Sequence, residues 1–286
     1  MAEALPESWN DMRLDSRILE AIKDLKWAAP LPIQKACIPH ALRGNDMSLQ
    51  SRTGSGKTGA FVIPMLQRYL ITIEREKAQK GKSTLESKPV GLILVPSLEL
   101  CEQTLEATQA LSKYIKPRMV VDNLCARGAI NDARILSADV VVTTAAALAK
   151  QIKSGAVTEA AFRNLKVVVM DEVDMVIAIS ERSIRLVQTV LPQTAQGILC
   201  SATLTEGVAS IKGQLLHNPV HITLTADDDD TPASAKRPRG SVVHDEPEVE
   251  SRITLKDTSA KTLKRQRWNL ASRLRTPQRR RSSSTT

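Results

Sequence analysis

The sequence predicts an α/β fold, in which helices cover both faces of a parallel β-sheet. From Asp46 to about Thr225, short apolar, β-rich runs alternate with amphipathic stretches, a pattern typical of strands joined by right-handed helical crossovers. Runs such as Val167–Met170 are continuously apolar, as expected for strands buried on both faces. A glycine-rich stretch, Ser51–Thr58, stands between a predicted strand and a predicted helix. Ligands of such sheets bind beyond the carboxyl ends of the strands, which is where this stretch falls.

Individual elements follow from these runs. The predicted strands are Met47–Ser51, Val90–Val95, Arg118–Asp122, Asp139–Thr143, Leu165–Met170, Gln196–Cys200 and Val220–Leu224. The predicted helices are Lys57–Tyr69, Glu99–Ser112, Ala145–Lys153, Glu181–Val190 and Glu206–Leu216. In the fourth helix, Ile184 and Val187 recur at helical spacing and begin one apolar face. The charged segment Ile73–Lys88 is interpreted as a solvated surface loop or an extension of the first helix.

Composition divides the chain into three parts, residues 1–45, 46–225 and 226–286. Because the chain is 42% hydrophobic but only 2% aromatic, its core must be built mainly from aliphatic side chains. Residues 226–286 are acidic and then basic, without apolar periodicity, so a disordered tail is predicted. From Arg252 onward there are eleven Lys or Arg residues and one acid, so the net charge of +9 belongs to the tail.

Several kinds of protein and site are disfavoured. The four cysteines form no Cys-x-x-Cys pair and are interpreted as reduced core residues of an intracellular protein. His217 and His221 are four residues apart, but Pro219 between them disrupts a helix, so no metal is assigned to them. The N-terminus lacks the features of a signal peptide, and no uncharged apolar run is long enough to cross a bilayer.

The stretch Ser51–Thr58 has the residues of a nucleotide phosphate loop. Small residues let several backbone N–H groups face one anion, and the following helix adds its positive end. Lys57 can reach the β- and γ-phosphates, and Thr58 can hold Mg²⁺. Ser51 stands where the strict pattern has Gly, and an ordinary glycine-rich turn is the alternative. The predicted nucleotide-contacting residues of the loop are Ser51, Arg52, Thr53, Gly54, Ser55, Gly56, Lys57 and Thr58.

A second cluster, Asp171–Asp174, directly follows the apolar strand Leu165–Met170. A carboxylate at the end of a buried strand beside a phosphate loop is the expected second anchor for Mg²⁺. Asp171 is predicted to hold the metal through water, and Glu172 to accept a proton from the attacking water. The predicted catalytic residues are thus Lys57, Asp171 and Glu172; the alternative for the cluster is a surface acidic turn.

With these segments in this order, the chain resembles the first RecA-like domain of DEAD-box RNA helicases over about residues 9–225. Ser51–Thr58 matches the family's first motif and Asp171–Asp174 its second, with Val173 for the usual Ala. Ser201–Thr203 matches the third, which implies that Ser201 and Thr203 couple nucleotide to RNA.

The resemblance extends to the adenine and RNA elements. Trp27–Gln34 resembles the adenine-recognising element, whose Gln34 amide can pair with adenine through one donor and one acceptor. Trp9 falls at the family's spacing for an aromatic residue, where it could stack on adenine or instead anchor the first helix. Pro96–Leu100 resembles the element that holds RNA backbone, so the resemblance implies RNA contacts by Pro96, Ser97 and Thr144.

The resemblance implies an ATP-dependent RNA helicase core with ATP and Mg²⁺ as cofactors and RNA as partner. The element ending at Gln34, the phrase Leu216–Val220 and the acidic run after the last strand are similar to nucleolar helicases that help build the large ribosomal subunit. This implies a nuclear, nucleolar location, a ribosomal precursor as the RNA, and other assembly factors as further partners. No membrane partner is expected.

The chain also departs from the family pattern, mostly on the RNA side. Leu31 replaces a Thr, Leu98 replaces a basic residue, and Ala145–Ala147 replaces a Pro-Gly-Arg run that contacts phosphate. Cys125–Gly128 only faintly resembles the family's glycine pair. The ATP side is therefore expected to be better preserved than the RNA side.

The sequence after Thr225 has no His-Arg-x-Gly-Arg-type element, so the second RecA-like domain is expected to be absent and catalysis incomplete. Two other functions stay open. One is a truncated, non-catalytic module that binds ATP or a partner protein. The other is a basic tail that anchors nucleic acid or directs nuclear import.

Overall fold

The computed structural model describes residues 5–80, 88–203, 205–226 and 251–257, and within them one eight-stranded sheet. The strand order is β3-β4-β2-β5-β6-β1-β7-β8. Every pair from β3 to β7 is parallel, and β8 is antiparallel to β7. The strands are β1 (Met47–Gln50), β2 (Gly91–Val95), β3 (Val121–Asn123), β4 (Val140–Thr144), β5 (Val167–Met170), β6 (Gln196–Ser201), β7 (Val220–Ala226) and β8 (Ser251–Asp257).

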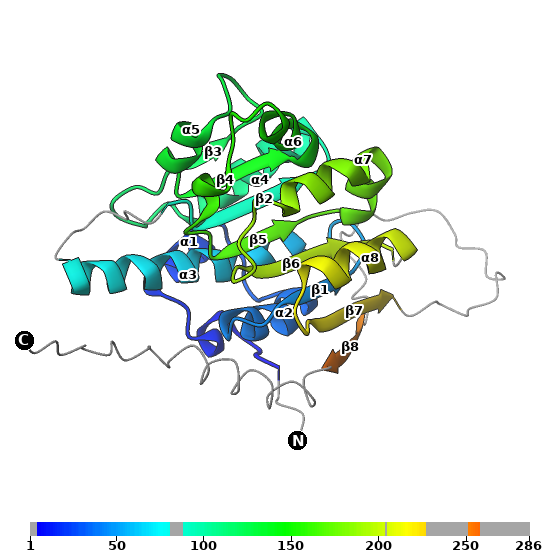
Figure 1. The fold of residues 1–286 in the computed structure, drawn as a ribbon. Coiled ribbons are helices and arrows are strands. Elements are labelled where there is room, and N and C mark those ends of the chain that lie inside the picture. Colours follow the sequence, from blue (N-terminus) through cyan, green and yellow to red (C-terminus); the bar gives the residue numbers. More distant parts are fainter. Residues whose placement is uncertain (1–4, 81–87, 204, 227–250, 258–286) are drawn as a thin grey trace, which may run out of the picture.

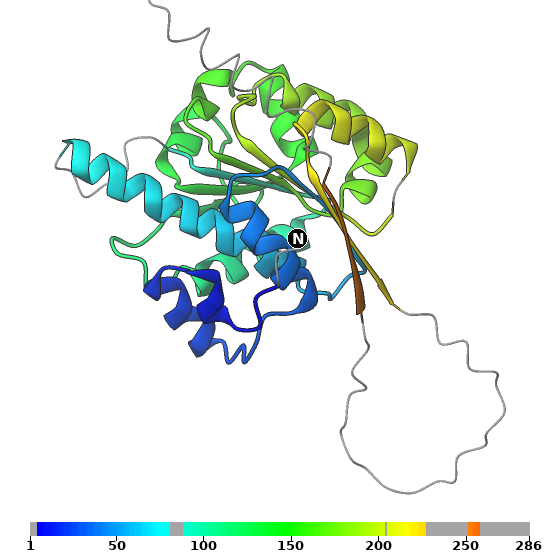
Figure 2. The same ribbon diagram turned by 90° about the horizontal axis from the view of Figure 1, so that it is seen from below.

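Helices cover both faces of the sheet. They are α1 (Ser16–Asp24), α2 (Pro32–Leu42), α3 (Lys57–Lys80), α4 (Leu98–Leu111), α5 (Asp132–Ser137), α6 (Ala145–Lys153), α7 (Val173–Gln188) and α8 (Glu206–Leu215), with 3-10 turns η1 (Trp9–Met12) and η2 (Glu159–Phe162). Helices α1–α4 share one hydrophobic core with one face, and α5–α8 share a second core with the other. Figures 1 and 2 show the blue and cyan helices α1–α3 on one side of the strands and the green-to-yellow α7 and α8 on the other.

The alternation of side chains along β5 shows why its sequence is apolar throughout. Val167 and Val169 belong to the core beneath α1–α4, whereas Val168 and Met170 belong to the core beneath α5–α8. Successive strand residues point to opposite faces, and all four are at most 6% exposed. A continuously apolar strand buried on both faces is what the sequence predicted.

All seven predicted strands are present in the parallel part of the sheet, with ends shifted by a few residues. Helix α3 continues to Lys80, so the described part of Ile73–Lys88 is a helix extension. Helix α7 starts at Val173, eight residues before the predicted Glu181, and bends where Ser180 has non-helical backbone angles. The run Met175–Ile179 before the bend is apolar at every position and so shows no helical period, and the sequence predicted only the segment after the bend.

The predicted disordered tail needs one correction. Ser251–Asp257 forms β8, which pairs along its whole length with β7, and the two strands lie side by side in Figures 1 and 2. β7 would otherwise leave the N–H and C=O groups of its outer edge unpaired. The strand signal in this segment is the alternation of Ile253 and Leu255 with polar residues, which is short and stands in a tail with no other apolar periodicity. Residues 227–250 and 258–286, including the basic runs proposed for nuclear import, lie outside the described residues.

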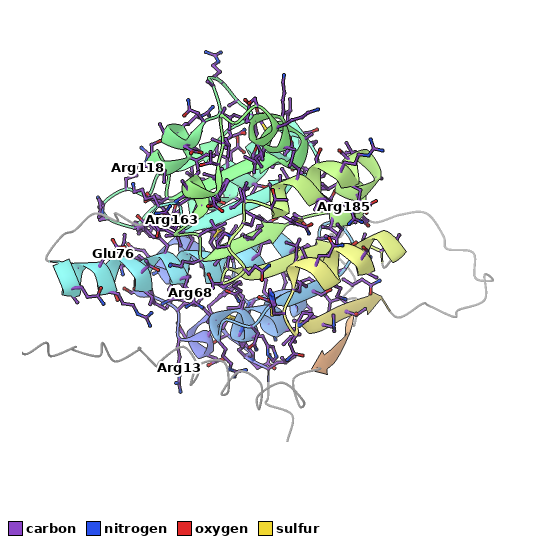
Figure 3. The ribbon with its side chains drawn as sticks, viewed as in Figure 1. Arg13, Arg68, Glu76, Arg118, Arg163 and Arg185 are labelled. Carbon is purple, nitrogen blue, oxygen red and sulfur yellow. The ribbon has the colours of Figure 1, made fainter. Side chains whose placement is uncertain are left out.

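Some of the charged side chains project from the surface. Figure 3 shows Arg13 projecting from the N-terminal helices and Arg185 on α7; the Arg185 guanidinium pairs with Glu181, one turn earlier, at 2.6 Å. Among the described residues, no helix combines the length and apolar character needed to span a bilayer.

Candidate nucleotide and RNA sites

The loop after β1 has a backbone that requires glycine. Gly54 and Gly56 have φ of +82° and +89°, in the left-handed region that side chains disfavour. A Cβ on Gly56 would also stand 2.5 Å from Leu31 Cδ1. The hydroxyl oxygens of Ser51 and Ser55 are 2.8 Å apart, so Ser51, in place of the usual Gly, closes the base of the loop with a hydrogen bond.

Lys57 begins α3 and is only 6% exposed. Its Nζ donates to the carbonyl oxygens of Ser51 at 2.8 Å and Arg52 at 3.2 Å. The ammonium group is thus held inside the loop by neutral acceptors, which an anionic oxygen can replace with a stronger, charge-assisted bond. Thr58 follows, half-buried, on the first turn of α3, while Arg52 and Thr53 are exposed at the rim.

Asp171 directly follows β5 and is 9% exposed. Burial raises the pKa of its carboxyl group to about 6, against the opposing effect of the nearby Lys57 charge. Its Oδ1 accepts from the Glu172 backbone N–H at 3.0 Å. Glu172 itself has φ of +47° immediately before α7, a conformation that costs energy for a non-glycine residue. A strained residue next to a buried carboxylate is typical of a functional site.

Asp174 joins this loop to the loop after β6. Its Oδ2 accepts from the Thr203 hydroxyl at 2.9 Å and from the Thr203 N–H at 3.1 Å. The Ser201 hydroxyl donates to the Thr203 carbonyl at 2.6 Å. Burial alone would raise the pKa of Asp174, but these hydrogen bonds hold it below its ordinary value. The predicted coupling residues are therefore in direct contact with the second motif.

Gln34 lies against the phosphate loop and is 2% exposed. Its Nε2 donates to the Gly56 carbonyl at 3.1 Å, and its Oε1 accepts from the Leu31 N–H at 2.8 Å. Both edges of the amide that was predicted to pair with adenine are thus engaged within the chain. Reading adenine requires Gln34 to exchange these bonds, which would connect base recognition to the loop at Gly56.

Trp9 is 7% exposed, and its indole N–H donates to the Trp27 carbonyl at 3.0 Å. The two indole rings stack with centroids 6.1 Å apart. This supports the anchoring interpretation of Trp9 over a ring free to stack on adenine. Trp27 instead lies near Gln34, because both side chains pack against Gly59. A Cβ added to Gly59 would be 3.0 Å from Trp27 Cζ3 and 2.6 Å from Gln34 Nε2. The chain has only three tryptophans, and two of them, Trp9 and Trp27, precede Gln34. This grouping was the feature of the sequence that could have pointed to Trp27.

The predicted RNA residues lie on the neighbouring strands. Pro96 and Ser97 follow β2, Thr144 ends β4, and Val95 and Thr144 are register partners in the two strands. Ser97 Oγ accepts from the Leu100 N–H, and Thr144 Oγ1 from the Ala147 N–H, each at 3.2 Å. Both hydroxyls therefore cap helices, α4 and α6 respectively.

Beside these caps the surface is apolar. Leu98 is 60% exposed, and together with Ala147 and Cys125 it lines a hollow of about 380 Å³. Lys150, on α6, is the basic residue of this lining. The family's basic residues at this position are thus replaced by a side-chain surface with little charge to hold phosphate.

The fold brings two sets of residues to one edge of the sheet. The nucleotide set surrounds the carboxyl ends of β1, β5 and β6, and the RNA set those of β2 and β4. Because β2 pairs with β5, the sets adjoin. Within the described residues, no three His, Cys, Asp or Glu side chains group to hold a metal alone. A magnesium ion here would depend on Thr58, Asp171 and phosphate oxygens together.

Comparison with known proteins agrees with this arrangement. Residues 31–211 match the DEAD/DEAH box helicase family. The chain is 32% identical over 229 residues to DEAD-box ATP-dependent RNA helicase 16 of Arabidopsis thaliana, covering 78% of this chain and 36% of that protein. It is 34% identical over 230 residues to ATP-dependent RNA helicase DBP9 of Ajellomyces capsulatus, covering 78% and 35%.

A solved structure shares the fold. A variant of S. cerevisiae Dbp5 bound to RNA and ADP BeF3 superposes with a TM-score of 0.60 and 25% identity, over 75% of this chain and 51% of that one. The chain spans about a third of the length of the curated relatives it matches. A parallel sheet in RecA-like order, a Lys57 phosphate loop and the Asp171–Asp174 cluster thus coincide with the matched segment, and the chain belongs to the DEAD-box helicases of the DEAD/DEAH box family.

Proposed function

We propose that this chain is the ATP-binding core of an ATP-dependent RNA helicase. The observation that carries the proposal is one continuous arrangement: Lys57 buried in the loop, Asp171 buried beside it, and Asp174 bonded to Thr203. A cation and a carboxylate kept out of water cost free energy unless a ligand uses them. No atom lies within 4 Å of the place where a Cβ on Gly54 would stand, so the loop is open to a ligand there.

Each residue then has a defined task. Bound Mg·ATP supplies the phosphoryl group and the charge that its hydrolysis redistributes. Lys57 would exchange its bonds to Ser51 and Arg52 for bonds to phosphate oxygens, and Thr58 and Asp171 would hold a magnesium ion, Asp171 through water. Glu172 accepts the proton of the attacking water at its carboxylate. Thr203 and Ser201 are bonded to Asp174. They would move with the loop of Asp171–Asp174 and so couple the bound nucleotide to the RNA-contacting residues.

The RNA partner is proposed to be held through its backbone by the segment of Pro96 and Ser97 and by Thr144. Support comes from their position beside the nucleotide set and from the family's activity. The similarity of Leu216–Val220 to nucleolar large-subunit helicases favours a ribosomal precursor as the RNA, a nucleolar location and other assembly factors as further partners. Because the contact surface has little charge, the basic tail from Arg252 onward is expected to contribute most of the affinity.

Calorimetry with Mg·ADP and Mg·GDP tests the nucleotide part. The purified chain should bind the adenine nucleotide and prefer it over the guanine nucleotide, because Gln34 lies at the loop. Glu172→Gln should retain binding and abolish whatever hydrolysis is present. No heat with millimolar adenine nucleotide would contradict the proposal, and binding with hydrolysis unaffected by Glu172→Gln would contradict the assigned base.

The chain by itself is expected to turn over slowly. The described residues contain one sheet, and the arginines that the second helicase domain contributes are worth roughly 10³–10⁵ in rate. RNA should barely stimulate hydrolysis, and a short duplex should stay paired. Steady unwinding of that duplex in a gel assay would show that the chain is catalytically complete.

A further inference from the structure

The guanidinium of Arg134 holds together the end of β3 and the loop that follows it. Arg134 lies on α5, and its side chain is only 19% exposed. Its Nε and Nη2 donate to the Asp122 carboxylate at 2.7 and 2.8 Å. Nη2 also donates to the Asn123 carbonyl at 3.0 Å, and Nη1 to the carbonyls of Leu124 and Gly128, each at 3.3 Å. Because a guanidinium has five N–H donors, this one has none left for a ligand.

Two contacts and a buried side chain fix the helix that carries Arg134. The Arg134 backbone N–H donates to the Asn131 side chain at 2.9 Å, which caps α5. Asp132, the first residue of α5, accepts from the Thr158 hydroxyl at 2.6 Å and from the Thr158 N–H at 2.8 Å. Ile135, the next residue after Arg134, is fully buried. The loop after β3 is therefore bonded to a fixed helix and does not depend on its own ends alone.

The tip of this loop, residues 127–129, carries hydrogen-bond donors that the chain does not use. All three residues are exposed, and Gly128 has φ of +84°. Within the described part of the chain, their backbone N–H groups donate no hydrogen bond, and the Arg127 guanidinium makes no ion pair. The Gly128 carbonyl points at Arg134, so the N–H of Ala129, across the same trans peptide bond, points away from it. Successive N–H groups in a turn form a concavity that binds anions.

The loop lies on the RNA half of the sheet edge. Its residues line the hollow of about 380 Å³ together with Leu98 and Lys150. Cys125, in the same loop, has its Sγ 3.8 Å from Thr144 Oγ1. A polyanion lying along this hollow would meet Lys150 on α6 and Arg127 at the loop tip. The two cations would supply positive charge that Leu98 does not.

We propose that Arg134 is a positioning residue for RNA, whose guanidinium turns the loop after β3 so that its tip takes an RNA phosphate. Arg134 itself does not touch the RNA. It draws three carbonyl oxygens, which would repel phosphate, to the inside of the loop, and leaves Arg127 and the N–H groups of the tip outside. That the anion is RNA rests on the proposed function, whereas the arrangement of the loop does not.

Arg134→Lys is the variant that separates position from charge. A lysine keeps the net charge of the chain, but its single ammonium group cannot reach the Asp122 carboxylate and three separate carbonyls in the fork geometry of a guanidinium. The loop should then keep Arg127 and lose its fixed shape. Asp122→Glu is a second variant of unchanged charge, because it moves the carboxylate that anchors the guanidinium by one methylene.

Fluorescence anisotropy of the full chain with a labelled oligouridylate, at two salt concentrations, gives the test. Arg127→Ala should weaken binding about fivefold and make the slope of log affinity against log salt shallower by about 0.7. Arg134→Lys should do the same, and the double variant should be no weaker than either single one, because both changes remove one contact. Arg163→Ala, at an exposed arginine before β5 on the opposite edge of the sheet, should leave the slope unchanged.

Additive losses in the double variant would make Arg134 a general stabiliser and overturn the proposal, as would an unchanged slope in Arg134→Lys. If thermal unfolding shows that Arg134→Lys does not fold, Asp122→Glu replaces it and should weaken RNA binding about twofold; unchanged binding would overturn the proposal. Calorimetry with Mg·ADP should give the same affinity for every folded variant. No Mg·ADP binding by the unmodified chain would contradict the proposed function, whereas normal Mg·ADP binding with equal RNA slopes in all variants would overturn this inference alone.

Discussion

The two halves of the sheet's carboxyl edge share one scaffold but differ in their charge. Around β1, β5 and β6, the charged residues Lys57 and Asp171 are both buried, with exposed fractions of 6% and 9%. Around β2, β3 and β4, Ser97 and Thr144 use their hydroxyls as helix caps, and Leu98 is exposed. Parallel strands place loops at both halves equally well, but only the first half holds charges that a ligand would satisfy.

This difference shows that the fold and the chemistry of a site are determined separately. The backbone that positions Ser97 is stabilised by the cap and by strand pairing, so replacing an adjacent basic residue by Leu98 leaves the element intact. Lys57 and Asp171 differ in this respect, because each charge moderates the cost of burying the other. Five substitutions test the contrast, and they are ordered here by expected effect.

Lys57→Ala should have the largest effect on ligand binding. A charged hydrogen-bond donor to phosphate is worth up to about 3 kcal/mol, so the affinity for Mg·ADP should fall on the order of 100-fold. Titration calorimetry measures it, with Lys150→Ala on the RNA half as the matched control. If the two variants bind Mg·ADP equally well, the nucleotide does not use Lys57.

Asp171→Asn should stabilise the folded chain while weakening Mg·ADP binding. The folded pKa of about 6 lies above the ordinary aspartate value of 3.8, so ionisation penalises the folded state above pH 6, and the penalty disappears as pH falls toward 4. Two pKa units correspond to about 3 kcal/mol at neutral pH. Urea unfolding at pH 7.5 and pH 5 should show a gain that shrinks at the lower pH.

Asp174→Asn is the control, because the lowered pKa of Asp174 predicts a change in folding stability of the opposite sign. Its ionised form stabilises the folded chain above the unfolded pKa, and this contribution is lost as pH falls through the lower folded pKa. Asp174→Asn should therefore destabilise the chain at pH 7.5. A gain in stability for both variants would refute the assigned difference between the two carboxylates.

Leu98→Arg should strengthen RNA binding by about fivefold and leave Mg·ADP affinity unchanged, because one added phosphate contact is worth about 1 kcal/mol. The slope of log affinity against log salt for single-stranded RNA should steepen by about 0.7. Fluorescence anisotropy at two salt concentrations measures both. Leu136→Arg, at another exposed position on α5, adds the same charge elsewhere; an equal gain there would mean that total charge, not this surface, binds RNA.

Thr203→Val should have the smallest effect. It removes the hydroxyl bond to Asp174 but keeps the backbone N–H bond, so the free energy of unfolding should fall by about 0.5–1 kcal/mol. Affinity for Mg·ADP should stay within twofold, since Thr203 does not touch the loop of Lys57. A large loss of nucleotide affinity in calorimetry would place Thr203 in the nucleotide site itself.

Local patterns in the sequence were sufficient for most of the parallel sheet. Apolar runs such as Val167–Met170 indicate burial on both faces of the sheet. Glycines that need positive φ, such as Gly54 and Gly56, predict a loop that can bind an anion. The strand β8 was missed because its pairing with β7 depends on a partner 25 residues or more away. Short helix α5 was missed because six residues are too few to show a period.

The candidate site was predictable by residue type and only partly by contact. The sequence by itself determined the glycine-rich loop, the acidic cluster and the loss of basic residues near Leu98, because these depend on the identity and spacing of neighbours along the chain. The tertiary structure decided that Trp27 rather than Trp9 lies beside Gln34, and that the Gln34 amide is engaged at Gly56. Those facts depend on which strands and helices pack together, and packing joins residues that no local period connects.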